Sequence, residues 1–195
     1  HPHCRRQRQM CIRDRSDTVA NITLIDGLTT SEVTMAAATV SISDTGATKA
    51  QVDAVNAFTT GTVTPTSVSE DRADLATLQG TAGISLSTTN ITVTDQVTKA
   101  QADTINAYTT GTVTLTSVAD TVANITAIDA LTTSQVNMAS ASITVTDQVT
   151  KANVDTINAY TTGTVTLTSV ADTVANITAI DALTTSQVNM ASASI

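Results

Sequence analysis

Residues 95–117 read DQVTKAQADTINAYTTGTVTLTS, and this stretch has a helix-like part followed by a strand-like part. Asp95 can cap a helix, because its carboxylate accepts the free N–H groups of a first turn. At 100° per residue, one apolar face carries Val97, Ala100, Ile105 and Tyr108. Gly111 stands where a left-handed C-terminal cap is expected. Apolar residues and Thr then alternate with the period of a half-buried strand, so the stretch predicts a helix and then a strand.

The same stretch recurs, because residues 91–142 and 143–194 are copies that differ only at positions 101 and 102. Ile195 begins a third copy, so we expect both ends of the chain to be cuts through a longer array. Near-identity indicates recent duplication of the DNA or a misassembled repeat. Internal repetition of small apolar residues is typical of a repeat architecture rather than of a single globular core.

Each copy divides again into two units of roughly 25 residues, a length too short to bury its own apolar face. An Asp precedes each unit; these residues are Asp17, Asp44, Asp71, Asp95, Asp120, Asp147 and Asp172. In the second half, DTVANITAIDAL (120–131) has an apolar residue at every third position, which predicts a short helix with a 3₁₀ portion. The VNM segment (136–138) reads as its strand.

These units predict an α/β solenoid of about seven coils, each with a short helix and a strand of a parallel sheet. The neighbouring repeats of the same chain would then be the main partners of each coil. An all-β parallel solenoid is the alternative, which the many β-branched residues favour. Pro65 replaces the Leu found at position 115, and it cannot donate a hydrogen bond in an interior ladder. We therefore expect a distortion there.

The N-terminal segment is unlike the rest of the chain, because RRQRQMCIRDR (5–15) holds five of its arginines. A basic arm for nucleic acid or an anionic membrane, and an Arg-rich transit peptide, are two readings. A metal site is a third, with the candidate ligands His1, His3, Cys4 and Cys11. The segment also resembles the translated transposon-end adapter of short-read sequencing libraries. We favour that interpretation, leave residues 1–15 out of the fold, and expect them to be disordered.

Charge and composition then restrict the function of residues 16–195, which we take as a fragment of the repeat solenoid. The whole chain has nine basic and 17 acidic side chains, a net charge of −8; residues 16–195 keep four and 16, a net charge of −12. Such acidity disfavours nucleic acid and anionic membranes as partners. No apolar run is long enough to cross a bilayer. All His and Cys lie in 1–15, so neither a Ser-His-Asp nor a Cys-His arrangement is available; we expect no enzyme, catalytic residue or cofactor.

Two ladders are the candidate sites. Asp95, Asp120, Asp147 and Asp172 are weak candidates for calcium held between coils. Calcium takes six to eight oxygens and each coil offers one Asp, so helix capping is favoured. The other ladder is a hydroxyl-and-methyl face that could bind a glycan or ice: Thr112, Thr114, Thr116, Thr164, Thr166 and Thr168. Gln135 and Asn137 interrupt it, and Thr is also an ordinary strand residue.

The units DTVANITAIDAL and ITVTDQVTKAQAD resemble repeat regions of very large bacterial secreted or surface proteins that are adhesin-like in character. The resemblance implies an extracellular or cell-surface location and a non-enzymatic structural or adhesive repeat segment. A module that binds glycan or ice through its Thr face is one alternative. A spacer from a secreted enzyme whose catalytic domain is missing is another.

Overall fold

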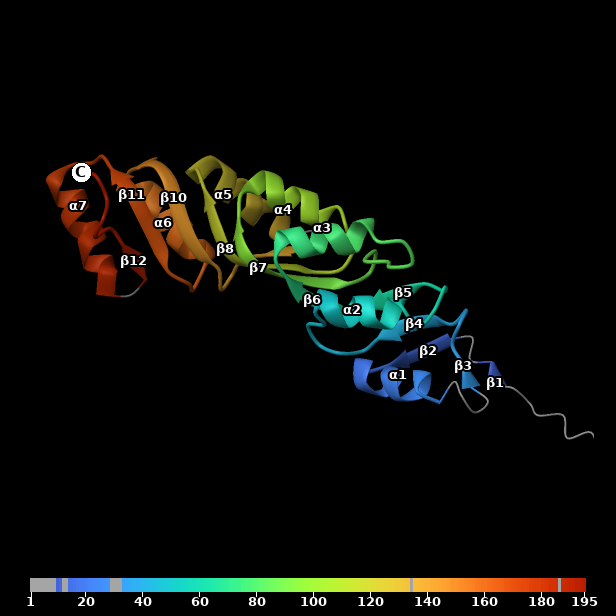
Figure 1. Ribbon diagram of the computed structural model, residues 1–195. Helices are drawn as coiled ribbons and strands as arrows, with labels where there is room; N and C mark the ends of the chain where they lie inside the picture. The colour runs from blue at the N-terminus through green and yellow to red at the C-terminus, as the bar shows by residue number, and fades with distance from the viewer. Residues whose placement is uncertain (1–9, 12–13, 29–32, 134, 186) are drawn as a thin grey trace, which may run out of the picture.

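The computed structural model describes residues 10–11, 14–28, 33–133, 135–185 and 187–195, and its elements follow one another along the molecule in chain order (Figure 1). Its helices are α1 (Val19–Asp26), α2 (Lys49–Asn56), α3 (Arg72–Gly80), α4 (Lys99–Asn106), α5 (Val122–Asp129), α6 (Lys151–Tyr160) and α7 (Val174–Asp181), with 3₁₀ turns η1 (Ala130–Thr133) and η2 (Ala182–Thr185). Its strands are β1 (Met10–Cys11), β2 (Asp14–Asp17), β3 (Val33–Thr34), β4 (Thr39–Ile42), β5 (Val63–Pro65), β6 (Ser67–Glu70), β7 (Asn90–Val97), β8 (Val113–Asp120), β9 (Val136–Asn137), β10 (Ser142–Val149), β11 (Val165–Val170) and β12 (Val188–Asn189).

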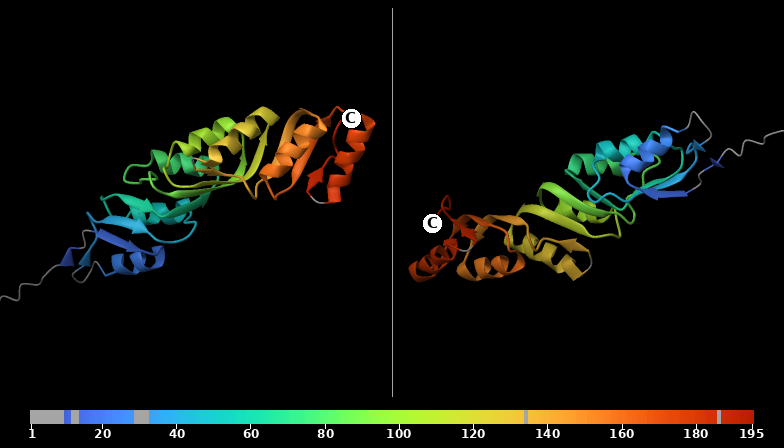
Figure 2. Two further views of the ribbon diagram at one scale, coloured as in Figure 1. Left: turned by 180° about the vertical axis from the view of Figure 1, so that it is seen from behind. Right: turned by 90° about the horizontal axis from the view of Figure 1, so that it is seen from below.

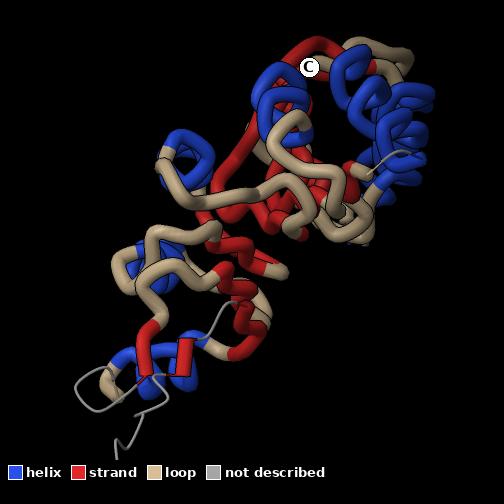
Figure 3. The backbone as a smooth tube through the Cα atoms, turned by 90° about the vertical axis from the view of Figure 1, so that its right-hand side faces the viewer, coloured by secondary structure: helices blue, strands red, loops and turns tan. Residues whose placement is uncertain are grey.

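All the strand pairs in the described residues are parallel, and they form three separate sheets. One sheet has the order β2-β4-β5, and a larger one has the order β12-β11-β10-β8-β7-β6, with β9 also on β8. Strands β1 and β3 form a two-stranded pair. Consecutive helices contact one another from α1 to α7, beside the strands (Figures 2 and 3).

The prediction of one solenoid of about seven coils is wrong. Over its described residues, the structure is an α/β fold in which seven α-helices accompany a three-stranded and a seven-stranded parallel sheet. The all-β alternative is wrong as well, because each of the two large sheets has helices beside it. The prediction that each unit combines a helix and a parallel strand is confirmed. The prediction that all the strands form one continuous sheet is wrong.

The division between the two large sheets falls at Pro65. This residue ends β5, which pairs along its length with β4 and on its other side makes only the isolated bridge of Val63 to Ile84. The next strand, β6, starts the seven-stranded sheet instead. Proline lacks the N–H group that an interior strand must donate, so a ladder that runs through position 65 loses a bond. In β8, Leu115 at the corresponding position is buried within a strand with partners on both sides.

The described helices other than α3 start at Thr residues that the sequence patterns did not identify. The backbone N–H of Thr98 donates to the Gln101 side chain at 2.8 Å, and that of Thr150 donates to the Asn153 side chain at 3.0 Å. The change of Gln101 to Asn153 between the copies therefore keeps the cap. The other change, Ala102 to Val154, places a larger apolar side chain at a buried position.

Helix α4 begins three residues later than the sequence predicted, because its N-cap is Thr98 and not Asp95. Asp95 and Val97 belong to strand β7, and Thr98 is the N-cap. Ala100, assigned to the apolar face, is exposed, whereas Ala102 and Ile105 are buried. The predicted apolar face is wrong at its start, because Val97 belongs to the alternating pattern of strand β7 and not to the helix.

The second half of each copy follows its prediction more closely. Helix α5 is succeeded by the 3₁₀ turn η1, as the three-residue spacing indicated, and Ile125 and Ile128 are both buried. The VNM segment supplies strand β9. Strand β10 starts only after a turn at residues 139–140, so the two strands are not continuous.

The expected disorder of residues 1–15 is corrected at four positions. Met10 and Cys11 pair with Val33 and Thr34, and Asp14 and Arg15 pair with Thr39 and Val40. Alternating backbone donors and acceptors suffice for such pairing, whatever the origin of the sequence. The candidate ligands His1, His3 and Cys4 lie outside the described residues. None of the described helices has the length and the apolar character needed to span a membrane.

Candidate functional site

A row of acidic side chains connects each unit to the one before it. The backbone N–H of the first residue of each helix from α1 to α6 donates to a carboxylate that lies 21 to 25 residues later in the chain. We call these acceptors the carboxylate row: Asp44, Glu70, Asp95, Asp120, Asp147 and Asp172. The first turn of a helix has unpaired N–H groups and a partial positive charge, and both favour a carboxylate there.

Asp120 shows how one carboxylate serves two helices. Its Oδ2 accepts the backbone N–H of Lys99, the first residue of α4, at 2.8 Å. Its Oδ1 accepts the backbone N–H of Thr121 at 2.8 Å and the amide of Asn124 at 2.8 Å, both at the start of α5. Only 9% of Asp120 is exposed. This carboxylate therefore joins the start of one helix to the start of the next.

The capping prediction identified the right residues but missed the helix of the preceding unit, whose first N–H group they accept. Asp95, Asp120, Asp147 and Asp172 do bond to helix N-termini, but to the helix of the preceding unit. In their own unit, Asp120 and Asp172 also bond to Asn124 and Asn176.

Glu70 is the member of the row that the sequence reasoning missed. The sequence pattern places Asp71 in the same series as Asp120, but Asp71 is itself the N-cap of α3, the position that Thr121 takes in α5. The residue that corresponds to Asp120 is therefore Glu70. The available signal was the acidic pair Glu70-Asp71, which matches the pair Asp120-Thr121 when the two helix starts are aligned.

The calcium candidates lie apart in the structure. Among the described residues, no three His, Cys, Asp or Glu side chains form a group that could hold a metal ion. Asp120 and Asp172 use both carboxylate oxygens to accept N–H groups, and Asp95 accepts both the backbone and the side chain of Arg72. N–H donors thus take up the oxygens that a cation would need.

The hydrogen bonds of the row affect its acidity. Burial raises the pKa of Asp120. The hydrogen bonds from Lys99, Asn124 and Thr121 together lower it by more than burial raises it, so the net shift is downward. The pKa of Asp172 is lowered by the equivalent bonds from Lys151, Asn176 and Thr173. Bonds from Asn21 and Thr18 likewise lower the pKa of Asp17.

These shifts predict that acid destabilises the fold. A carboxyl whose pKa is lower in the folded state contributes stability above the unfolded pKa, near 3.8, and loses it as the pH falls through the folded value. We expect the thermal unfolding midpoint to fall as the pH is lowered from about 5 to about 1, the interval over which an Asp with a lowered folded-state pKa loses its contribution to stability. Calorimetry across that range measures the effect, and the Asp120→Asn variant should show a shallower slope; an equal slope would contradict it.

A second set of contacts between units comes from the Thr-Thr-Gly segments, defined as residues 59–61, 109–111 and 161–163. In the second segment, the buried Thr109 hydroxyl donates to the Thr89 carbonyl at 2.6 Å and accepts the Gly111 N–H at 2.8 Å. Thr110 donates both its N–H and its hydroxyl to the Ser87 carbonyl. The other two segments repeat these bonds.

Gly111 has a different role from the one predicted. Positive φ angles occur in the described residues only at Gly46 and Gly83, so Gly111 is not a left-handed cap. Instead, a Cβ at Gly111 would lie 2.5 Å from the Thr89 carbonyl oxygen. The absence of a side chain lets the segment approach the backbone of the preceding unit.

The predicted Thr face is divided between two strands and partly used within the fold. Thr114 is in register with Thr92, and Thr166 is in register with Thr144. The Thr116 hydroxyl donates to the Val93 carbonyl at 2.7 Å, and Thr168 donates to the Val145 carbonyl at 2.8 Å. Each bond falls where the strand register shifts, and it supplies a partner to a carbonyl at that irregularity. Thr112 and Thr164 are exposed just before their strands.

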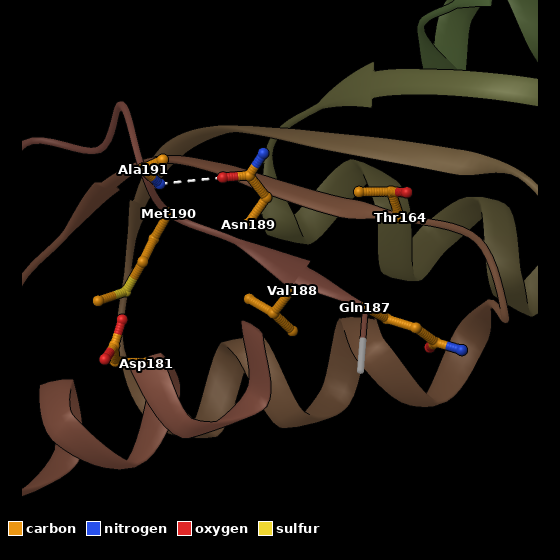
Figure 4. A pocket seen from close by; sticks show the side chains of 7 residues that line it. All are labelled: Thr164, Asp181, Gln187, Val188, Asn189, Met190 and Ala191. Atoms are coloured by element: carbon orange, nitrogen blue, oxygen red, sulfur yellow. Dashed lines mark hydrogen bonds between the residues drawn. The ribbon is translucent and has the colours of Figure 1, made fainter. Parts of the chain in front are cut away.

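A hollow of about 550 Å³ lies at the C-terminal end of the described chain, beside β12 and α7 (Figure 4). Its lining comprises Thr164, Asp181, Gln187, Val188, Asn189, Met190 and Ala191. Asn189 Oδ1 accepts the N–H of Ala191 at 3.0 Å and so fixes the turn after β12. The lining combines apolar and polar groups and has no cluster of titratable side chains.

The chain matches no protein-family model, no curated protein and no solved structure. What it does must therefore be inferred from its own contacts, and the carboxylate row and the Thr-Thr-Gly segments are the contacts that recur.

Proposed function

We propose that this chain is a non-enzymatic structural repeat segment of a large bacterial extracellular or surface protein, adhesin-like in character. The observation that carries the proposal is that polar side chains of each unit complete the unit before it. The carboxylate row caps the preceding helices, and the Thr-Thr-Gly segments bond to the preceding turns. Such contacts serve to join units.

The joining contacts are the same in both 52-residue copies. Lys99 donates to Asp120 at 2.8 Å, and Lys151 donates to Asp172 at 2.8 Å. Thr109 and Thr161 each donate to a carbonyl of the preceding unit at 2.6 Å. The two Asp bonds each join two units inside one copy, whereas the Thr161 bond joins the second copy to Ala141 of the first. Because the same groups recur in each copy, a further copy can be added without a new kind of contact. This property suits a structural segment whose role depends on its length, which added copies would increase.

A length series tests the proposal. One, two and four further copies of residues 143–194 are inserted after Ser194, which keeps the repeat in phase. Each copy supplies two more layers of strands, so small-angle scattering should show the maximum dimension growing by about 10 Å per copy, at about 4.8 Å per strand. The matched control is a 52-residue Gly/Ser-rich insert, which should add no helical circular dichroism. Added copies that leave the maximum dimension unchanged would refute the structural role.

The extracellular part of the proposal has its own test, a long sequencing read across the parent locus. A secretion signal or a surface-anchoring segment in the same reading frame would support it. A reading frame with neither would count against it. The same read decides whether RRQRQMCIRDR is encoded in the gene, as a functional basic arm would require.

A further inference from the structure

Strand pairing is interrupted on both sides of residues 63–70, which form β5 and β6. The corresponding strand β8 is continuous, and it pairs with β7 along both halves, with β9 on its first half and with β10 on its second. In contrast, β5 pairs fully only with β4, and β6 pairs fully only with β7. On their other sides they make isolated bridges, Val63 to Ile84 and Val68 to Ala47. Within the described residues, these two bridges are the strand pairing between the two large sheets (Figure 1).

A glycine turn accounts for the first interruption. The chain from Ile42 to the helix cap Thr48 is one residue longer than the chain from the corresponding Val93 to the cap Thr98. The extra residue is accommodated in a turn at Gly46, whose φ is +67°. Glycine adopts this left-handed conformation without steric cost. Strand β4 therefore ends early, whereas β7 continues to the residue before its helix cap.

The second interruption combines Pro65 with Gly83. Pro65 has no N–H to donate beyond the bridge of Val63. Gly83, next to that bridge, has a φ of +86°, and a Cβ there would lie 2.7 Å from Asn56 Oδ1. Gly46 and Gly83 are the positive-φ residues of the described chain, and they lie on opposite sides of residues 63–70. The departures from regular backbone thus gather at one layer.

The contacts that remain on the helix side of this layer are made by long or rotatable side chains. The N–H of Lys49 donates to the Glu70 carboxylate, and the Asn56 amide donates to the Ala82 carbonyl at 3.2 Å. Glu70 is the one Glu of the carboxylate row, and it has one more rotatable bond than Asp. It can therefore keep its bond to α2 over a wider range of positions of that helix.

We propose that this layer is a joint at which the array bends, with Thr66 as its pivot. The N–H of Thr66 donates to the Ile42 carbonyl at 2.8 Å, and its own carbonyl accepts the N–H of Asn90 at 3.0 Å. Thr66 is thus bonded to both sheets. Hinges move packed bodies through changes at a few backbone positions, and each sheet here keeps its own ladder during such a movement. The inference does not depend on the proposed function, because it concerns only the backbone pairing of this chain.

Spin labels at equivalent positions test the joint in the full chain. Ala50, Ala100 and Ala152 are exposed second residues of α2, α4 and α6. With Cys4→Ser and Cys11→Ser in the background, one variant carries Ala50→Cys and Ala100→Cys, and its matched control carries Ala100→Cys and Ala152→Cys. Each pair has one helix between its labels, but only the first pair spans the joint. We expect electron–electron double resonance to give a broader distance distribution for the first pair. Equal widths would overturn the proposal.

The Pro65→Leu variant tests the cause of the bending, because it restores the missing donor. It should narrow the distribution across the joint and leave the control pair unchanged; an unchanged width across the joint would overturn the role of Pro65. Hydrogen exchange gives a second readout without labels. The N–H of Val63 donates to Gly83 at 2.7 Å, and that of Val113 donates to Gln135 at 2.9 Å. Val63 should exchange faster than Val113 despite its shorter bond, and slower exchange at Val63 would contradict the joint.

Discussion

The Gly111→Ala variant should lose about 1–3 kcal/mol of its free energy of unfolding, the usual cost of forcing a methyl group into a filled space. The new Cβ would lie 2.5 Å from the oxygen and 2.8 Å from the carbon of the Thr89 carbonyl. Both atoms belong to the backbone of the preceding unit, so neither can rotate away. Relief requires that the Thr-Thr-Gly segment 109–111 move off that unit, which lengthens the bond from Thr109 to Thr89.

Urea unfolding measures this loss, and the Tyr160→Phe background makes Tyr108, three residues before the substitution, the one fluorescent reporter. Gly80→Ala is the matched control, because a Cβ at Gly80 meets no atom within 4 Å and Gly80 ends helix α3. That variant should be as stable as the parent or slightly more stable, since Ala favours helix over Gly. Equal unfolding curves for Gly111→Ala and Gly80→Ala would contradict the assigned role of Gly111.

The Asp120→Asn variant should also be destabilised, by about 2–3 kcal/mol, because hydrogen bonds to a charged acceptor are the stronger ones. An amide has one oxygen where the carboxylate has two, while Lys99 and Thr121 donate to different oxygens of Asp120. In either orientation the NH₂ group of Asn faces an N–H donor. One of the two helix starts therefore loses its acceptor at a position that is 9% exposed.

Hydrogen exchange at Lys99 and at Thr121 shows which helix start is released. The control is Asp103→Asn in helix α4, where Asp103 has a side chain 46% exposed and pairs only with Lys99. A surface pair of this kind contributes roughly 0–1 kcal/mol, so Asp103→Asn should change stability little. If both variants lost the same small amount, the bonds of Asp120 would be no stronger than a surface ion pair.

The sequence predicted the components of this fold better than their assembly. Alternating Thr and apolar residues in 112–117 correctly indicated a strand, and the three-residue spacing of 120–131 correctly indicated a helix with a 3₁₀ end. Both signals are local, since each depends on the side-chain period of a single element. The division into sheets depends on how strands meet, and only Pro65 carried a sequence signal for it.

The candidate site was predicted only in part, because local patterns do not show which elements meet in space. An Asp ahead of each unit suggested helix capping, and the structure shows capping. The helix that is capped could not be identified from spacing, because Asp120 lies close in sequence to α5 and close in space to the start of α4. The prediction for Gly111 was wrong for a similar reason. A Gly after a helix usually indicates a residue in the left-handed conformation. Here the Gly is needed because the backbone of Thr89, 22 residues earlier, lies too close to leave room for a side chain.

The carboxylate row also sets an order on biosynthesis. A ribosome releases the N-terminal end first, and the acceptor for each helix start is encoded 21 to 25 residues after it. The first N–H of a nascent helix therefore lacks its carboxylate acceptor until the ribosome has translated the following unit, although the N-cap residue of that helix is already present. Each newly translated unit supplies the carboxylate for the helix before it, while its own helix still waits for the next unit. A translational pause therefore leaves only the newest helix without this acceptor.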